Sequence, residues 1–269
     1  MKTGINIRVM GDQSSRETIC RVLQLAEQCG IESAWIVDHI AIPPDDAEGS
    51  GGRYLDPITT LAWMAGQTQS IMIGTSVLIL PYRPMLPTAK SIATIQELSE
   101  GRLLLGVGIG WMQPEFNALG IPRQQRGKIS DETLAFIHEC FSNDEVILNG
   151  QPFLFRPRPK RPPIFVGGAA PHALDRAIRY GDGWLPMGRL EKLIPDIAVY
   201  KRRSLDETGT QGEVVTFASI QDLTEADATL LLRRYEDAGV DRVILGQSYQ
   251  KAEDWIPTLQ LLEKVNHRQ

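Results

Sequence analysis

His39 is the residue of this sequence best placed for acid–base chemistry. It follows Asp38 at the end of the apolar segment 33–37, which has the composition of a buried strand. An imidazole can donate, accept or carry a proton near neutral pH. We therefore take His39 as a candidate catalytic residue. The alternative is a histidine that Asp38 holds by a hydrogen bond for a structural purpose only.

A second candidate is the segment 101–116, GRLLLGVGIGWMQPEF. Its apolar start is typical of a parallel strand that is covered on both faces. Gly106, Gly108 and Gly110 alternate at its end and leave an edge without side chains, against which a large flat molecule could lie. These glycines are two residues apart, and no glycine follows at the helix-opening position that the nicotinamide-binding fingerprint G-x-G-x-x-G requires. Trp111 follows directly. It could form an apolar wall beside the flat molecule or a substrate, or it could cap the core.

These residues need a scaffold that brings strand ends together. Hydrophobic periodicity predicts eight strand–helix pairs, which close into a single (β/α)8 barrel, with an open doubly wound sheet as the alternative. A small hairpin over 146–155, turning at Asn149-Gly150, is expected as an excursion before the fifth strand. Strands are expected at 5–9, 33–37, 71–78, 103–108, 163–166, 183–186, 214–220 and 242–245, with helices over about 15–30, from 57, and over 87–99, 127–141, 171–180, 190–206, 226–238 and 251–265.

In such a barrel the site lies at the carboxyl ends of the strands, where the unusual residues of this sequence gather. Asp38-His39 follows the second predicted strand, Gly108 to Trp111 ends and follows the fourth, and Gly183-Trp184 belongs to the short sixth strand. The long connection 42–56, rich in proline and glycine, has the length of a functional or mobile loop and is expected to cover the substrate.

Composition narrows the partners. The chain has 269 residues, 42% of them hydrophobic, and a net charge of −5. This balance is ordinary for a soluble enzyme and argues against a nucleic-acid surface. We expect a small-molecule substrate, no nucleic-acid partner, no membrane span and a cytoplasmic location; a homodimer is compatible with the sequence. The three cysteines lack metal-ligand spacing, so no metal site is expected, and the proline-laced basic run 156–161 is expected to be an exposed linker rather than an anion site.

Taken together, these motifs resemble the luciferase-like monooxygenase family of flavin- and deazaflavin-dependent oxidoreductases. The resemblance covers residues 1–269 as one domain. It rests on GRLLLGVGIGW with Glu115-Phe116, PPIFVGG at 162–168, GDGW at 181–184 and VDH ending at His39. Within the family the sequence is similar to the shorter branch that depends on coenzyme F-420.

The resemblance implies where the cofactor lies. The isoalloxazine or deazaisoalloxazine ring would cross the barrel mouth with Ser76 and Val77 beneath its central ring, in a bulge with a non-prolyl cis peptide. An ordinary strand is the alternative there. Gly108 and Gly110 would line the ring, and His39 would lie beside ring and substrate, orienting the cofactor or acting as acid–base catalyst.

The cofactor phosphate is expected at the turn 167–171. Gly167, Gly168, Ala169 and Ala170 precede Pro171 at the start of a predicted helix. Small residues allow close approach, and the free N–H groups and positive end of a helix favour an anion. The alternative is a tight turn that needs small residues for its own geometry.

The sequence departs from the family's sugar-phosphate dehydrogenases in one respect. Those enzymes have a glutamate directly after the strand-four glycines, where this chain has Trp111. A sugar phosphate is therefore not the expected substrate, and Trp111 and Trp184 are predicted to line the substrate pocket. Glu115 is interpreted as a helix-start residue stabilised by the helix dipole, with a carboxylate near the site as the alternative.

Three functions remain at this point. The first is hydride transfer between coenzyme F-420 and a small organic substrate. The second is monooxygenation by reduced FMN and oxygen, and the third is a flavin-binding protein without turnover. A deazaflavin does not readily form the oxygen adduct that monooxygenation needs, so the first two differ in their demand for oxygen.

Overall fold

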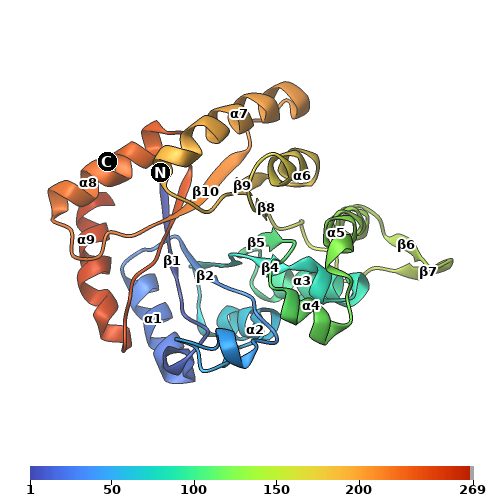
Figure 1. Cartoon of the computed structure of the whole chain (residues 1–269), viewed down its shortest axis with the longest axis horizontal. Helices are drawn as coiled ribbons and strands as arrows, with labels where there is room; N and C mark the ends of the chain where they lie inside the picture. The colour runs from blue at the N-terminus through green and yellow to red at the C-terminus, as the bar shows by residue number, and fades with distance from the viewer. Residues whose placement is uncertain (267–269) are drawn as a thin grey trace.

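The predicted barrel is confirmed. In the computed structural model, which describes residues 1–266, parallel strands close into a barrel of eight positions, because β3 pairs with β2 on one side and with β5 on the other (Figure 1). The third position is shared by two short strands, β3 and β4. The barrel strands are β1 (Lys2–Asn6), β2 (Ser33–Ile36), β3 (Met72–Thr75), β4 (Leu78–Ile79), β5 (Leu103–Gly108), β8 (Ile164–Gly167), β9 (Gly183–Leu185), β10 (Glu213–Ala218) and β11 (Arg242–Leu245).

Helices follow the strands and cover the outside of the barrel. Ser15 begins the first by accepting a hydrogen bond from the Thr18 N–H, and Asp56 begins the second in the same way at Thr59, just before Pro57. The main helices are α1 (Arg16–Gln28), α2 (Pro57–Gln67), α3 (Met85–Leu98), α5 (Arg126–Ser142), α6 (His172–Tyr180), α7 (Leu190–Thr208), α8 (Glu225–Asp237) and α9 (Ile256–Asn266).

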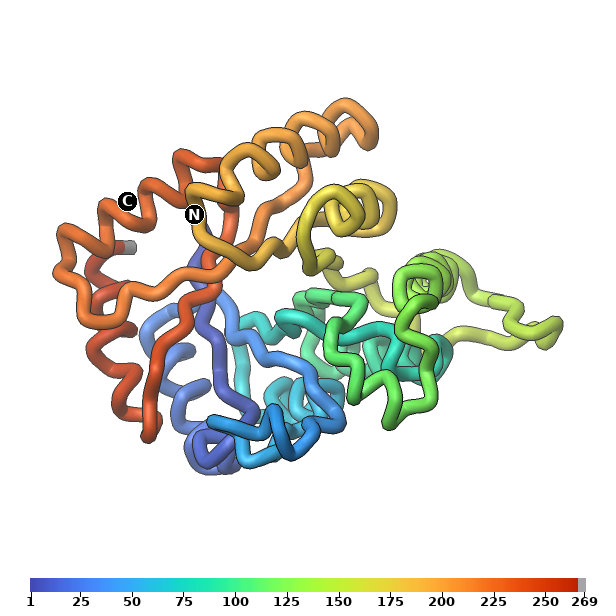
Figure 2. Tube along the Cα trace, in the orientation of Figure 1, coloured from blue at the N-terminus to red at the C-terminus, as the bar shows by residue number. Residues whose placement is uncertain are grey.

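The chain leaves this alternation at two places. The predicted hairpin is present as β6 (Glu145–Leu148) and β7 (Gln151–Leu154), with positive φ at Asn149 and Gly150, and it projects away from the barrel (Figure 2). The seven-residue helix α4 (Gln113–Leu119), which the periodicity did not predict, follows β5. Short 3-10 turns are η1 (Asp12–Ser14), η2 (Pro44–Asp46), η3 (Leu80–Tyr82), η4 (Arg123–Gln125) and η5 (Ala252–Trp255).

Two layers of apolar side chains hold the barrel. The inner layer fills the barrel interior, with Trp35 and Phe165 in edge-to-face contact at 5.9 Å between ring centroids. The outer layer lies between strands and helices and includes Trp184, which contacts Tyr200 of α7. This filled interior leaves only the strand ends free to form a site.

The glycines of β5 are explained by the neighbouring strand. β3 and β4 are separated by a cis peptide between Ser76 and Val77, which confirms the irregular backbone expected there. A Cβ on Gly106 would overlap the carbonyl oxygen of Thr75, and one on Gly108 would overlap the Val77 side chain. The alternating glycines therefore make room for the third strand as well as for anything at the mouth.

The basic run 156–161 is not a free linker. Arg156 and Arg158 both pair with Asp144 beside the hairpin, and Arg161 pairs with Asp182 at 2.8 Å. These contacts fasten the segment to the barrel, while Arg156 and Lys160 are exposed and the segment is irregular, as expected of a linker. In the described part of the chain, no helix is long and apolar enough to cross a bilayer.

Candidate active site

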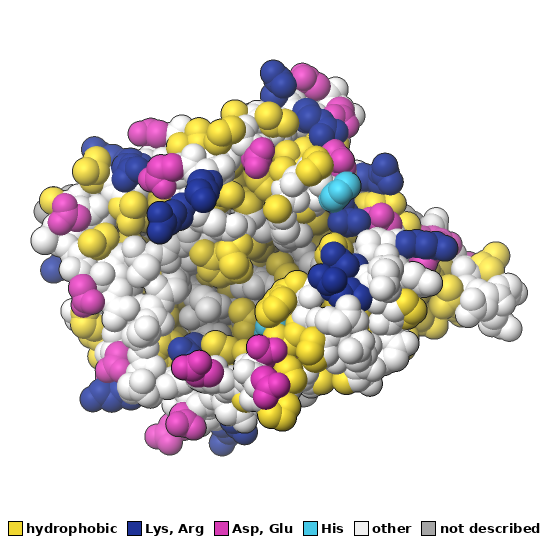
Figure 3. Space-filling view, viewed as in Figure 1, with side chains coloured by type: hydrophobic (Ala, Val, Ile, Leu, Met, Phe, Trp, Pro, Cys, Tyr) yellow, Lys and Arg dark blue, Asp and Glu magenta, His cyan; other side chains and the backbone are white. Residues whose placement is uncertain are grey.

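A cavity of about 390 Å³ opens at the carboxyl ends of the strands. Figure 3 shows the central hollow of this face with hydrophobic side chains in it and a histidine at its lower rim. The structure brings most of the predicted site residues together around the cavity. These are His39, Ser76, Val77, Gly108, Gly110, Trp111, Gly167 and Gly168.

His39 is held by a buried carboxylate that sequence reasoning undervalued. Its Nδ1 lies 3.0 Å from Oε2 of Glu115, which comes from the first turn of α4, 76 positions away. Glu115 lies in the first turn of α4, as expected of a helix-start residue, but it is fully buried and supplies the nearby carboxylate that was the alternative. Its Oε1 accepts hydrogen bonds from the N–H groups of Ile40 at 2.6 Å and Ala41 at 3.1 Å.

These contacts keep Glu115 ionised. Burial alone would raise the pKa of this carboxyl, but the hydrogen bonds from His39, from two backbone N–H groups and from the Tyr82 hydroxyl, at 2.7 Å, lower the pKa to about 2. Burial and the adjacent Glu115 raise the pKa of Tyr82, which therefore stays a donor. An ionised carboxylate only accepts, so His39 must donate from Nδ1, and Nε2 is the ring nitrogen left for another partner.

Asp38 has a different partner from the one considered for it. Its carboxylate accepts from the Ile79 N–H at 2.8 Å and from both ends of the Arg83 guanidinium, at 2.6 and 3.0 Å. Arg83 also pairs with Asp56 at 2.9 Å. The idea that Asp38 braces His39 is therefore wrong. Asp38 instead connects the end of β2 to β4 through Ile79 and to Arg83. Arg83 in turn connects Asp38 to Asp56 at the start of α2.

Aromatic side chains enclose the imidazole. Tyr54 lies edge-on at 5.0 Å between ring centroids and Trp111 at 6.2 Å. Tyr54 belongs to the predicted covering loop, and an isolated bridge to Met10 fixes it there. Trp111 is 64% exposed and lines the cavity, so it is free to contact a bound molecule.

The cavity floor suits a flat polar ring. Val77 rests between β5 and β8, because a Cβ on Gly167 would lie 2.8 Å from its Cγ1 and one on Gly108 would overlap its Cγ2. The hydroxyl of Ser76 is buried at the cavity and has no hydrogen-bond partner within residues 1–266. A buried hydroxyl normally has a partner, so a bound ring with polar atoms fits this position.

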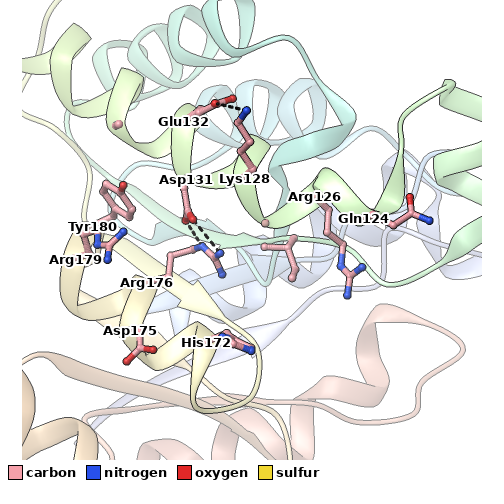
Figure 4. A pocket seen from close by; sticks show the side chains of 13 residues that line it. Gln124, Arg126, Lys128, Asp131, Glu132, His172, Asp175, Arg176, Arg179 and Tyr180 are labelled. Carbon is pink, nitrogen blue, oxygen red and sulfur yellow. Dashed lines mark hydrogen bonds and ion pairs between the residues drawn. The ribbon is translucent and has the colours of Figure 1, made fainter.

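The turn 167–171 connects this cavity with a second one. Gly168 lines the barrel-mouth cavity with φ of 123°, while Ala169 and Ala170 lie outside it. Pro171 follows a cis peptide and α6 begins at His172. His172 lines a groove of about 700 Å³ between α5 and α6 (Figure 4). The predicted phosphate turn is thus the bridge between the two cavities.

Trp184 is not at the substrate cavity. Its side chain is fully buried in the outer layer, and its indole N–H donates to the carbonyl of Gly168 at 2.9 Å. Side chains alternate along β9, so Leu185 points to the barrel interior and Trp184 points toward the helices. The prediction that Trp184 lines the substrate pocket is wrong; the residue supports the turn 167–171 from behind.

Sequence reasoning missed Tyr82 and Arg83. Both lie after the split third strand, in or just beyond a 3-10 turn, and act on residues 33 and 45 positions away. A usable signal for Glu115 was its place just before Phe116, which is fully buried. A carboxylate next to a core residue on a short amphipathic helix can face inward.

Comparisons with known proteins agree with this architecture. The model of the luciferase-like monooxygenase family matches residues 2–209. A coenzyme F-420 dependent hydroxymycolic acid dehydrogenase of Mycobacterium tuberculosis is 30% identical over 196 residues, 69% of this chain and 53% of the relative. The chain thus spans about half the length of that relative.

Two solved structures share the fold. Monooxygenase RslO1 from Streptomyces bottropensis superimposes with a TM-score of 0.83 at 19% identity, covering 100% of both chains. A type II Baeyer–Villiger monooxygenase, the oxygenating constituent of 3,6-diketocamphane monooxygenase of Pseudomonas putida, solved with FMN, gives 0.76 at 15% identity over 98% of this chain and 96% of that one.

The fold is a (β/α)8 barrel, and its candidate site is the cavity at the carboxyl ends of the strands. The chain belongs to the luciferase-like monooxygenase family, whose members are flavin- or F-420-dependent oxidoreductases and monooxygenases.

Proposed function

We propose that the protein transfers a hydride between coenzyme F-420 and a small organic substrate, with His39 as the acid–base residue. The observation that carries this proposal is the buried, ionised Glu115, which fixes the His39 ring at the cavity through Nδ1. A single imidazole with one nitrogen free toward a cavity is suited to proton transfer.

The protein's own residues would divide the work. Ser76 and Val77 would support the ring from below, and Gly108 and Gly110 would leave its edge uncovered. When bound, the cofactor supplies hydride chemistry. His39 would take up or deliver, at Nε2, the proton that the substrate loses or gains with the hydride. Trp111 and Tyr54 would shield the reacting atoms from water.

The cofactor phosphate would bind at the turn 167–171. Support comes from the exposure of Gly168, which has no side chain, and of Ala169, which has a small one, and from the position of the turn directly before α6. The hydrogen bond from Trp184 to the Gly168 carbonyl would hold the turn in place.

The choice of coenzyme F-420 is supported by the mycobacterial relative, which is an F-420 dependent dehydrogenase. The second candidate is FMN-dependent monooxygenation, which is supported by the two monooxygenases of the same fold. Both candidates use the same cavity, and they differ in the fate of the reduced cofactor.

Oxygen uptake distinguishes the two candidates. Purified protein would be saturated with reduced coenzyme F-420 or with reduced FMN, and oxygen consumption would be followed with candidate alcohols, ketones and aldehydes. We expect tight binding of F-420 and substrate-dependent cofactor turnover without oxygen uptake. Substrate-stimulated oxygen uptake with reduced FMN, and no turnover with F-420, would establish the second candidate instead.

A further inference from the structure

The groove between α5 and α6 has no role in the chemistry described so far. It measures about 700 Å³, larger than the barrel-mouth cavity, and is lined by the N-terminal half of α5 and by α6. Figure 4 shows Arg126, Arg176 and His172 reaching from these two helices toward a common space. A groove of this size and composition is suited to an extended anion.

The charges of the groove do not cancel. Its acidic residues are engaged: Asp131 by Arg176 at 2.5 Å, Glu132 by Lys128 at 3.7 Å and Asp175 by Arg203 at 2.7 Å. Arg203 comes from α7.

Two cations of the groove have no carboxylate partner within residues 1–266. Arg126 donates only to the carbonyl of Arg123, and its Nε is buried without a partner. Arg179 lies over the ring of Tyr180, 5.8 Å from the centroid. Figure 3 shows Lys and Arg side chains gathered to the right of the central hollow, where Figure 1 places α5 and α6. The groove therefore offers free positive charge to a ligand.

The groove continues directly from the proposed cofactor site. Ile109 lines both cavities, and the turn 167–171 runs from Gly168 at the mouth to His172 at the groove. A molecule whose ring lies on Val77 and whose phosphate lies at this turn would have its next atoms at Arg126 and Arg176. A phosphate alone would occupy only the near end of the groove.

Resting on the proposed function, we propose that the groove binds the chain of carboxylates that extends beyond the cofactor phosphate and thereby selects coenzyme F-420 over FMN. The deazaflavin coenzyme carries an oligoglutamate after its phosphate, whereas FMN ends at the phosphate. Guanidinium groups match carboxylates in a two-point geometry. Each exposed pair contributes little, so selection comes from several pairs together and weakens with salt.

Equilibrium binding tests this inference without turnover. Deazaflavin fluorescence would be titrated with the wild-type protein and with the Arg126→Gln/Arg179→Gln double variant. Three probes are used: coenzyme F-420 with its glutamates, the deazaflavin alcohol lacking phosphate and glutamates, and FMN, followed by its own fluorescence. The matched control is Arg233→Gln/Arg234→Gln, which removes two exposed charges from α8.

We expect the double variant to bind coenzyme F-420 about tenfold more weakly, and the other two probes within about twofold of wild type. The control variant should match wild type for all three probes. Raising the salt concentration should weaken F-420 binding in wild type more than in the double variant. Arg126→Lys/Arg179→Lys, which keeps both charges, should recover most of the affinity.

Two failures are distinguishable. If wild type binds F-420 tightly and the double variant binds it equally well, the groove inference is wrong and the proposed function stands. If wild type binds FMN but not F-420, the proposed function is wrong, and this inference falls with it.

Discussion

The two cavities at the carboxyl ends of the strands are built in opposite ways. The barrel mouth is formed largely by backbone and by a buried hydrogen-bond network, in which Glu115 accepts four hydrogen bonds beneath His39. The α5–α6 groove is formed by long side chains, several of them exposed, whose charges face solvent. The mouth can therefore hold reacting groups in fixed positions, as reaction chemistry requires. The groove supplies positive charge, whose attraction for a ligand tolerates movement of the side chains.

Glycine substitutions should separate the two regions most strongly. Gly106→Ala would place a Cβ on the carbonyl of Thr75, and we expect it to lower the free energy of unfolding by about 3 kcal/mol or to prevent folding. Gly127→Ala, in the groove, would meet only the Arg176 guanidinium at 3.5 Å, an ordinary contact distance, and should stabilise α5 by about 0.5–1 kcal/mol. Urea unfolding measures both. Equal changes in the free energy of unfolding for the two substitutions would contradict the contrast between the barrel mouth and the groove.

Carboxylates should show the same contrast with pH. The pKa of Glu115 is lowered to about 2 in the folded protein, from 4.5 in the absence of these contacts, so its ionised form stabilises the fold above pH 4.5. This stability is lost as pH falls from 4.5 toward 2. At pH 7 we expect Glu115→Gln to cost about 3 kcal/mol.

The difference in free energy of unfolding between wild type and Glu115→Gln should decrease as the pH falls from 4.5 toward 2. Glu132→Gln, in the groove, should cost under about 0.5 kcal/mol, because its pair with Lys128 is exposed. Denaturant titrations from pH 7 to pH 2.5 give both quantities. A gap for Glu115→Gln that does not change with pH would show that shape rather than charge holds the network.

The turn between the cavities should affect cofactor binding alone. Ala169→Asp places a negative charge where we propose the cofactor phosphate, and we expect the dissociation constant to rise at least tenfold, about 1.4 kcal/mol. Ala169→Asn, of the same size but uncharged, is the control and should have a smaller effect. Fluorescence titration measures both. Equal effects of Asp and Asn would indicate steric blocking, and unchanged affinity would move the phosphate elsewhere.

The barrel was predictable because its signals are local. Segments such as 103–108 and 242–245 coincide with β5 and β11, since buried parallel strands are apolar on both faces. The first strand was placed at 5–9 but is Lys2–Asn6. Ile7 and Val9 are buried although they lie beyond the end of the strand, so the hydrophobic pattern extends further along the chain than the strand pairing does.

Site residues were predictable from the sequence only where they lie at or directly after the end of a predicted strand. His39, Ser76 and Gly108 were placed correctly at the mouth because each follows or ends a strand. The Glu115 network joins residues 33 and 76 positions apart, and no local pattern shows which distant groups a carboxylate on a short helix will meet. Trp184 was misplaced because a strand-end position alone does not show which face of the strand a side chain occupies.

The central claim is that His39, oriented by Glu115, transfers a proton in step with the hydride. Single-turnover oxidation of the bound reduced cofactor, measured against pH in wild type and His39→Ala, tests it most directly. We predict that the variant is slower by about 10² to 10⁴ and has a changed pH profile, with cofactor affinity nearly unchanged. An unchanged rate and pH profile in a folded, cofactor-saturated variant would contradict the account.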